Sequence, residues 1–67
     1  MHADLPTPAQ RRALREAAGL SQAEVARIVG VTTAAVGHWE TGVRQTPRNP
    51  TVFERYVQVL RALREAI

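Results

Sequence analysis

The residues whose chemistry stands out lie in the middle of the sequence, where short polar side chains precede a group of arginines. In a helix over residues 33–41, inward-pointing Val36 and Trp39 would leave small or polar residues on the outer face, at about 100° of rotation per residue. That outer face consists of Thr33, Ala34, Gly37, His38 and Thr41. Short side chains allow close approach to base edges, and threonine or histidine can hydrogen-bond there. Thr33, Ala34, Gly37 and His38 are therefore candidate base contacts. The alternative is a short surface helix of low helix propensity.

Groups that could bind phosphate flank this outer face on both sides. Ser21 and Gln22 stand at the predicted start of the preceding helix, where free backbone N–H groups and the helix dipole favour an anion. Arg44, Gln45 and Arg48 follow the helix directly, although an arginine in a loop is often merely solvated. Phosphate contacts from both flanks are what fix a helix in a groove of DNA. The predicted phosphate contacts are Ser21, Gln22, Thr32, Thr41, Arg44, Gln45 and Arg48.

Capping residues predict where the helices that carry these side chains begin. A serine, threonine or asparagine stands before each helix, and the predicted N-caps are Thr7, Ser21, Thr32 and Asn49. The spacings from Thr7 to Gln10 and from Ser21 to Glu24 are those of capping boxes. The predicted helices span residues 8–18, 22–29, 33–41 and 50–67. Because no stretch alternates with the period of a strand, we expect an all-α fold.

The second and third predicted helices share a turn and an apolar seam. Gly30 can take the positive φ that a sharp turn requires, and Ala26 is small enough for two helix backbones to approach. The seam consists of Val25, Val29, Val31, Val36 and Trp39. Two short helices that meet at a glycine-containing turn form a helix-turn-helix, here over about residues 22–41.

Length and composition exclude several classes of protein. The 67 residues predict one domain over residues 1–67, with residues 1–6 as a flexible arm. There is no cysteine, and the two histidines lack carboxylates placed to complete a zinc site, so we expect no disulfide, metal or other cofactor. Because the core of so short a chain is thin, we also expect no small-molecule ligand. No catalytic group of nucleophile, base and acid converges, and the only aspartate, Asp4, lies in the arm. We therefore expect no enzymatic activity.

The charge balance favours a nucleic-acid partner. All nine basic residues are arginines, against six acidic residues, which gives a net charge of +3 and an isoelectric point near 11.1. No apolar run is long enough to cross a membrane, and no signal peptide is evident. The expected location is the cytoplasm, on the nucleoid, or the host cytoplasm if a phage encodes the protein.

The segment from Leu14 to Gly42, LREAAGLSQAEVARIVGVTTAAVGHWETG, resembles the helix-turn-helix of the Cro-repressor family, which includes the lambdoid phage repressors. The specific motifs are GLSQAE, the turn glycine and WETG, and with the last helix the likeness covers nearly the whole chain. The resemblance implies a lambda-repressor-like fold of four helices and binding to double-stranded DNA.

The resemblance also implies roles for single residues. The implied base-facing residues are Thr33, Ala34 and His38, and the implied phosphate contacts are Gln22, Thr41, Arg44 and Gln45, with Arg48 near the backbone or minor groove. The family pattern further pairs Arg15 with Glu40 as a largely buried ion pair.

Two positions depart from the family pattern. Arg11 stands where the family usually has an apolar core residue, so either the first helix is rotated or Leu5 fills that space. Thr33 and Ala34 replace the glutamines that read adenine in some members, so no known operator sequence can be transferred.

The last predicted helix carries two apolar stripes, which together span about 180°, more than one core-facing helix requires. One stripe consists of Phe53, Val57, Leu60 and Ile67 and is expected to close the core. The other consists of Val52, Tyr56, Val59 and Leu63 and is the predicted homodimer interface. The alternative is that a thin domain wraps the whole helix more fully.

Together these features predict a transcriptional regulator that binds a pseudo-palindromic operator as a homodimer and represses by occluding a promoter. The rival hypothesis, from another class, is an antitoxin-like protein-interaction module for which DNA binding is secondary.

Overall fold

The computed structural model describes residues 5–44 and 46–66, and no strand occurs among them. Its helices are α1 (Pro8–Ala17), α2 (Gln22–Val29), α3 (Thr33–Thr41) and α4 (Pro50–Ala66). The prediction of an all-α fold with four helices is confirmed. Helix α1 ends one residue earlier than predicted, because Ala18 serves as its C-cap.

Side chains cap the helices as the sequence predicted. The Ser21 hydroxyl accepts the Glu24 backbone N–H at 3.0 Å, and the Glu24 carboxylate accepts the Ser21 N–H at 2.8 Å. Thr7 and Gln10 make the same reciprocal exchange at the start of α1. The capping side chains are those of Thr7, Ser21, Thr32 and Asn49. Each cap satisfies backbone N–H groups that have no partner within the helix.

The turn between α2 and α3 depends on Gly30. Its φ of +89° lies in the left-handed region, which a residue with a side chain rarely adopts. The N–H groups of Gly30 and Val31 both donate to the Ala26 carbonyl, at 2.8 and 2.9 Å. These bonds end α2 and turn the chain sharply into α3.

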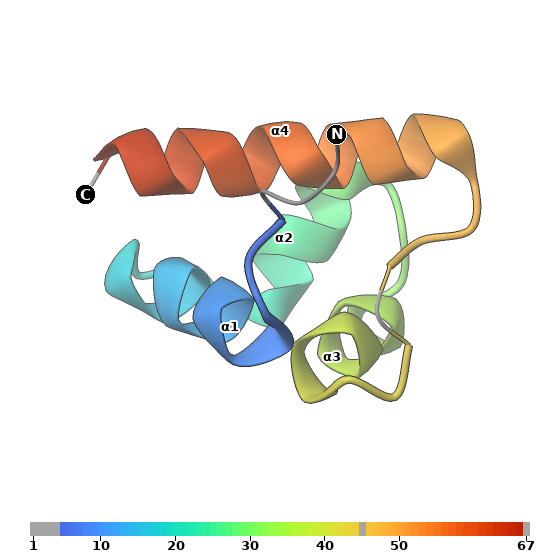
Figure 1. Ribbon diagram of the computed structural model, residues 1–67, viewed down its shortest axis with the longest axis horizontal. Coiled ribbons are helices and arrows are strands. Elements are labelled where there is room, and N and C mark those ends of the chain that lie inside the picture. The colour runs from blue at the N-terminus through green and yellow to red at the C-terminus, as the bar shows by residue number, and fades with distance from the viewer. Residues whose placement is uncertain (1–4, 45, 67) are drawn as a thin grey trace.

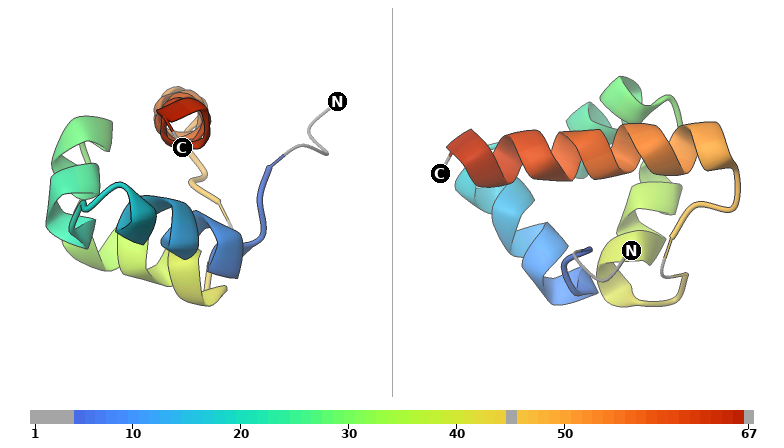
Figure 2. Two further views of the ribbon diagram at one scale, coloured as in Figure 1. Left: turned by 90° about the vertical axis from the view of Figure 1, so that its left-hand side faces the viewer. Right: turned by 45° about the horizontal axis from the view of Figure 1, so that its top comes forward.

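Helices α3 and α4 lie on opposite sides of the molecule (Figure 1). Helix α4 crosses α1 and α2 along one side, while α3 packs against the same two helices from the other side. The left-hand view of Figure 2, along the axis of α4, shows the same separation. The outer face of α3 therefore points away from α4.

The core lies where the helices meet. Its buried members are Val25, Ala26, Val29, Val36, Trp39, Tyr56 and Leu60. The rings of Trp39, from α3, and Tyr56, from α4, lie 4.6 Å apart between their centroids and are tilted by 45°. This aromatic contact connects the two outer helices through the interior.

One expectation about the N-terminal part was wrong. Leu5 and Pro6 do not belong to a loose arm, because Pro6 is buried and Leu5 packs against the core; residues 1–4 lie outside the described residues. Ala17, the last residue of α1, is exposed. The inner face of α1 buries Arg11 and Arg15, whose guanidinium groups have hydrogen-bond partners inside the fold.

The assignment of the two stripes of α4 was also wrong. Tyr56 is 1% exposed and Leu63 is 9% exposed, so both belong to the interior of the protomer rather than to a free surface. Val52 and Val59, from the same predicted interface, are half-buried and pack against the core. From the stripe expected to close the core, Leu60 is buried, whereas Phe53 and Val57 remain only half-buried outside the core cluster. Ile67 lies outside the described residues.

Candidate nucleic-acid interface

The outer face of α3 is exposed in the first turn and the last turn of the helix. Val36 and Trp39 are buried, as the sequence predicted, with 0% and 4% of their surface exposed. The exposed residues on the opposite face are Thr33, Ala34, His38 and Thr41. These side chains are short or uncharged, so the helix presents a smooth surface with few donors and acceptors, suited to close approach.

Gly37, also predicted for this face, is covered. It is half-buried, and a Cβ atom at this position would lie 3.5 Å from Oε1 and 3.7 Å from Nε2 of Gln22. The amide group of Gln22 therefore lies over the backbone of α3 at Gly37.

A hollow of about 370 Å³ lies beside the outer face, between α3 and the described residues Arg44 and 46–49. Ala34 and His38 line it from α3, and the exposed Arg44 and Arg48 line it from the segment that follows. Its remaining lining is largely apolar, from Val31, Thr32, Ala35, Trp39, Thr46, Pro47, Asn49 and Val52. The fold thus brings two candidate base contacts and two candidate phosphate contacts to one concave surface. Gln45, a further candidate, lies outside the described residues.

The start of α2 is already occupied by a carboxylate. The Ser21 N–H, and secondarily its hydroxyl, hold the pKa of Glu24 below its ordinary value by hydrogen bonding to it. Glu24 therefore carries its negative charge at neutral pH beside this helix terminus. Because its N–H and, secondarily, its hydroxyl are engaged with Glu24, Ser21 can donate to an anion only if its hydroxyl turns away from that carboxylate.

The two threonines at the ends of α3 differ in what they can donate. The Thr32 hydroxyl oxygen accepts the Ala35 N–H at 3.1 Å, which leaves its proton available to a phosphate. The Thr41 hydroxyl donates to the His38 carbonyl at 3.3 Å. The Thr41 hydroxyl must rotate away from this carbonyl before it can donate to DNA. Thr32 can therefore donate to a phosphate more readily than Thr41.

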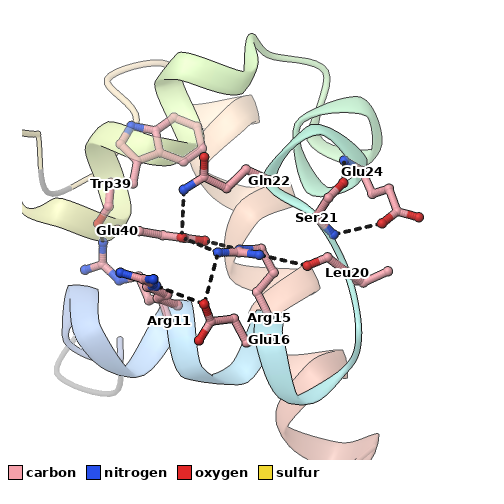
Figure 3. A network of polar contacts seen from close by, with 10 residues as sticks. Arg11, Arg15, Glu16, Leu20, Ser21, Gln22, Glu24, Trp39 and Glu40 are labelled. Carbon is pink, nitrogen blue, oxygen red and sulfur yellow. Dashed lines mark hydrogen bonds and ion pairs between the residues drawn. The ribbon is translucent and has the colours of Figure 1, made fainter.

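A buried ion pair joins α1 to the last turn of α3 (Figure 3). Nε of Arg15 lies 2.7 Å from Oε2 of Glu40, and Nη2 lies 3.0 Å from Oε1. The two side chains are 10% and 3% exposed, and Arg15 also donates to the Leu20 carbonyl at 2.8 Å. The hydrogen bond to Glu40 raises the pKa of Arg15. The structure thus contains the pair that the family resemblance implied, and this pair holds the last turn of α3 against α1.

Sequence reasoning did not foresee the role of Arg11. Its Nε donates to the Pro6 carbonyl at 2.8 Å, and its Nη1 donates to the Trp39 carbonyl at 3.2 Å. Arg11 thereby joins the segment before α1 to α3. Helix α1 is not rotated, since Arg15 still reaches Glu40, and Leu5 packs against the core as one of the two alternatives anticipated. The spacing of Arg11 and Arg15 could have indicated this position, because residues four apart share a helix face and Arg15 was already expected to point inward.

Two other kinds of site find no support in the described part of the chain. Residues 5–44 and 46–66 contain no group of three or more His, Cys, Asp or Glu side chains that could hold a metal ion. No helix among them is long and apolar enough to cross a membrane.

The helices α2 and α3, joined by the sharp turn at Gly30, form a helix-turn-helix, an arrangement that occurs in DNA-binding domains. A family model described as a helix-turn-helix domain matches residues 9–67, and the chain therefore belongs to this family. Comparison with curated proteins and with solved structures found no match. The contacts of single residues with DNA remain predictions.

Proposed function

We propose that this protein is a sequence-specific transcriptional regulator that places α3 in the major groove of double-stranded DNA. The observation that carries the proposal is the concave surface in which the outer face of α3 adjoins Arg44 and Arg48. Its small side chains fit contacts to base edges, and its arginines fit contacts to phosphate. The motifs GLSQAE and WETG further support a repressor of the Cro type, which would act by occluding a promoter.

Selection of bound sites from random duplexes, followed by titration at several salt concentrations, tests this proposal. Each neutralised phosphate should contribute about −0.9 to the slope of log K against log salt. The exposed Arg44 and Arg48 then predict a slope of about −2 for one protomer and about −4 for a dimer. Binding that is unchanged between about 50 and 200 mM salt, or a selection that enriches no sequence, would contradict it.

Replacing His38 and Arg48 separately should distinguish base reading from phosphate binding. His38→Ala is expected to reduce discrimination at one or two base pairs per half-site by about 1 kcal/mol, because one imidazole N–H makes a single contact. Arg48→Ala should instead weaken selected and random duplexes equally and make the salt slope shallower by about 1 per protomer. Competition titrations with both kinds of duplex measure these effects. If His38→Ala weakens all duplexes equally, His38 is a phosphate contact.

The proposal includes a homodimer on a pseudo-palindromic operator, with two recognition helices about 34 Å apart. Because Tyr56 and Leu63 are buried in the protomer, the interface is assigned to the half-buried Phe53 and Val57, one turn apart on α4. These apolar side chains lie outside the core cluster and would gain burial in a second copy.

A charge introduced on this face should separate the protomers. Val57→Asp is expected to give a folded monomer and to raise the protein concentration needed for half-saturation of the operator about tenfold, or about 1.4 kcal/mol. Ala62→Asp, an exposed position on the other flank of α4, is the matched control and should remain dimeric. Sedimentation and operator titration measure both properties. A parent protein that is monomeric at high concentration and occupies a single half-site would rule out this interface.

A protein-interaction module is the second candidate, and the surface between α2 and α4 favours it. Ile28 is 58% exposed and borders a groove shared with Val59 and Ala62. A module of this kind, for which DNA binding is secondary, would enrich no sequence strongly in the selection. The same experiment therefore distinguishes the two candidates.

A further inference from the structure

The side chain of Gln22 lies against α3 instead of extending into solvent. Its Nε2 donates to Oε1 of Glu40 at 3.1 Å, across 18 residues of sequence. Its amide also lies within van der Waals distance of a Cβ position on Gly37. Figure 3 shows Gln22 above Glu40, with its amide nitrogen directed at the carboxylate. Gln22 is therefore held at the edge of the outer face of α3.

The ion pair determines which end of the amide points inward. A carboxylate can only accept hydrogen bonds, so it selects the NH₂ end of Gln22 and turns the amide oxygen elsewhere. Glu40 is itself held by two hydrogen bonds from the planar guanidinium of Arg15. The orientation of Gln22 thus depends on a rigid buried pair. One N–H of the amide is used, and the second remains available.

The surroundings of Gln22 favour a phosphate as the acceptor for that second N–H. The adjacent Ser21 N–H is engaged with Glu24, so it does not compete for the anion. Arg15 balances the charge of Glu40, which lowers the electrostatic cost of bringing a phosphate near that carboxylate. A reversed amide would present its oxygen to the phosphate, and two acceptors cannot form a hydrogen bond.

We infer that Arg15 and Glu40 are positioning residues that orient the Gln22 amide for donation to one DNA phosphate in each half-site. This inference rests on the proposed function. It assigns the buried ion pair a role in DNA recognition in addition to its role in the fold. A side chain larger than that of alanine at Gly37 would displace the amide from α3, whereas a Cβ atom alone would make ordinary van der Waals contact with it.

A phosphate-by-phosphate scan tests the inference. Each phosphate of the selected duplex is replaced in turn by an uncharged methylphosphonate, and binding is measured for the parent protein, Gln22→Ala and Glu40→Gln. One phosphate per half-site should contribute about 12- to 150-fold through Gln22, as expected for a single hydrogen bond to a charged group. That contribution should disappear in Gln22→Ala and shrink in Glu40→Gln, whose amide no longer selects one end of Gln22. Gln58→Ala, an exposed position on α4, is the control and should keep the parent pattern.

The pattern of loss separates positioning from stability. A merely structural Glu40 would lower binding at all phosphates equally, and this result would overturn the inference. A Gln22→Ala protein with the parent pattern, or with a changed base preference instead, would also overturn it. If the parent protein binds no duplex at all, the proposed function itself is wrong.

A measurement without DNA keeps the inference testable if Glu40→Gln folds poorly. In the NMR spectrum of the free parent protein, the two Nε2 protons of Gln22 should differ widely in chemical shift, because one donates to a carboxylate. Gln10, whose amide oxygen accepts from Thr7, is the internal comparison and should show an ordinary pair. Similar splittings for both residues would contradict the fixed orientation of Gln22.

Discussion

Replacing Arg15 with alanine is expected to destabilise the fold by about 3–5 kcal/mol in the absence of DNA. The substitution leaves the Glu40 carboxylate, whose side chain is 3% exposed, buried without its cationic partner. It also removes the donor to the Leu20 carbonyl. Since a small domain has a total stability of only about 5–15 kcal/mol, much of the protein should unfold at moderate urea concentration. Urea titration followed by circular dichroism measures the change.

The same helix offers a matched control. Arg12 and Glu16 form an ion pair at 3.0 Å, but their side chains are 62% and 52% exposed. Arg12→Ala should therefore cost only about 0.3–0.5 kcal/mol. Replacing both Arg15 and Glu40 with methionine should recover most of the lost stability, because no unpaired charge remains buried. An Arg15→Ala protein that unfolds like the parent but binds DNA poorly would place Arg15 on the DNA surface instead.

The second large effect is expected in alkaline solution, where the protein should lose up to about 2.7 kcal/mol of stability between pH 10 and 12. Burial raises the pKa of Tyr56 from 10.0 to about 12, against the opposing influence of the Arg11 guanidinium. Two pKa units at about 1.36 kcal/mol each give this value. The folded protein keeps the phenol neutral while the unfolded chain ionises, so the unfolded state binds fewer protons. Stability is thus fully present below pH 10 and declines as the pH rises towards 12.

In this pH range, the composition of the chain leaves Tyr56 as the one side chain that is expected to titrate. Tyr56 is the single tyrosine, the sequence has no lysine or cysteine, and arginine stays protonated throughout this range. Urea titrations at stepped pH, together with tyrosinate absorbance, measure the loss. Tyr56→Phe should abolish the pH dependence and remain folded, because the hydroxyl makes no hydrogen bond of ordinary geometry to any described residue. An equal alkaline loss in Tyr56→Phe would assign the effect to another group.

Helix positions could be predicted closely from the sequence, because the forces that set them act within a few residues. Ser21 and Glu24 satisfy each other's backbone N–H groups whatever the rest of the chain does. Gly30 adopts a conformation that few other residues tolerate. The face of α3 was also predictable, since Val36 and Trp39 are its large apolar residues and must point inward.

The orientation of α4 could not be predicted in the same way. Its two apolar stripes are similar in size, and periodicity alone gives no preference between them. The choice depends on how α4 crosses α1 and α2, where the Tyr56 ring meets Trp39 in the interior. Phe53 and Val57 consequently remain half-buried.

The sequence by itself determined the four helices, their caps, the sharp turn and the outer face of α3, since all of these follow from local hydrogen bonding and helical period. Only the tertiary structure decided that Arg11 is buried, because its guanidinium donates inside the fold to distant carbonyl acceptors such as that of Trp39. The same holds for Gln22, whose amide orientation is set by Glu40 on another helix. Hydrogen-bond partners of this kind come together only when the helices pack, and no spacing along the chain encodes their distance.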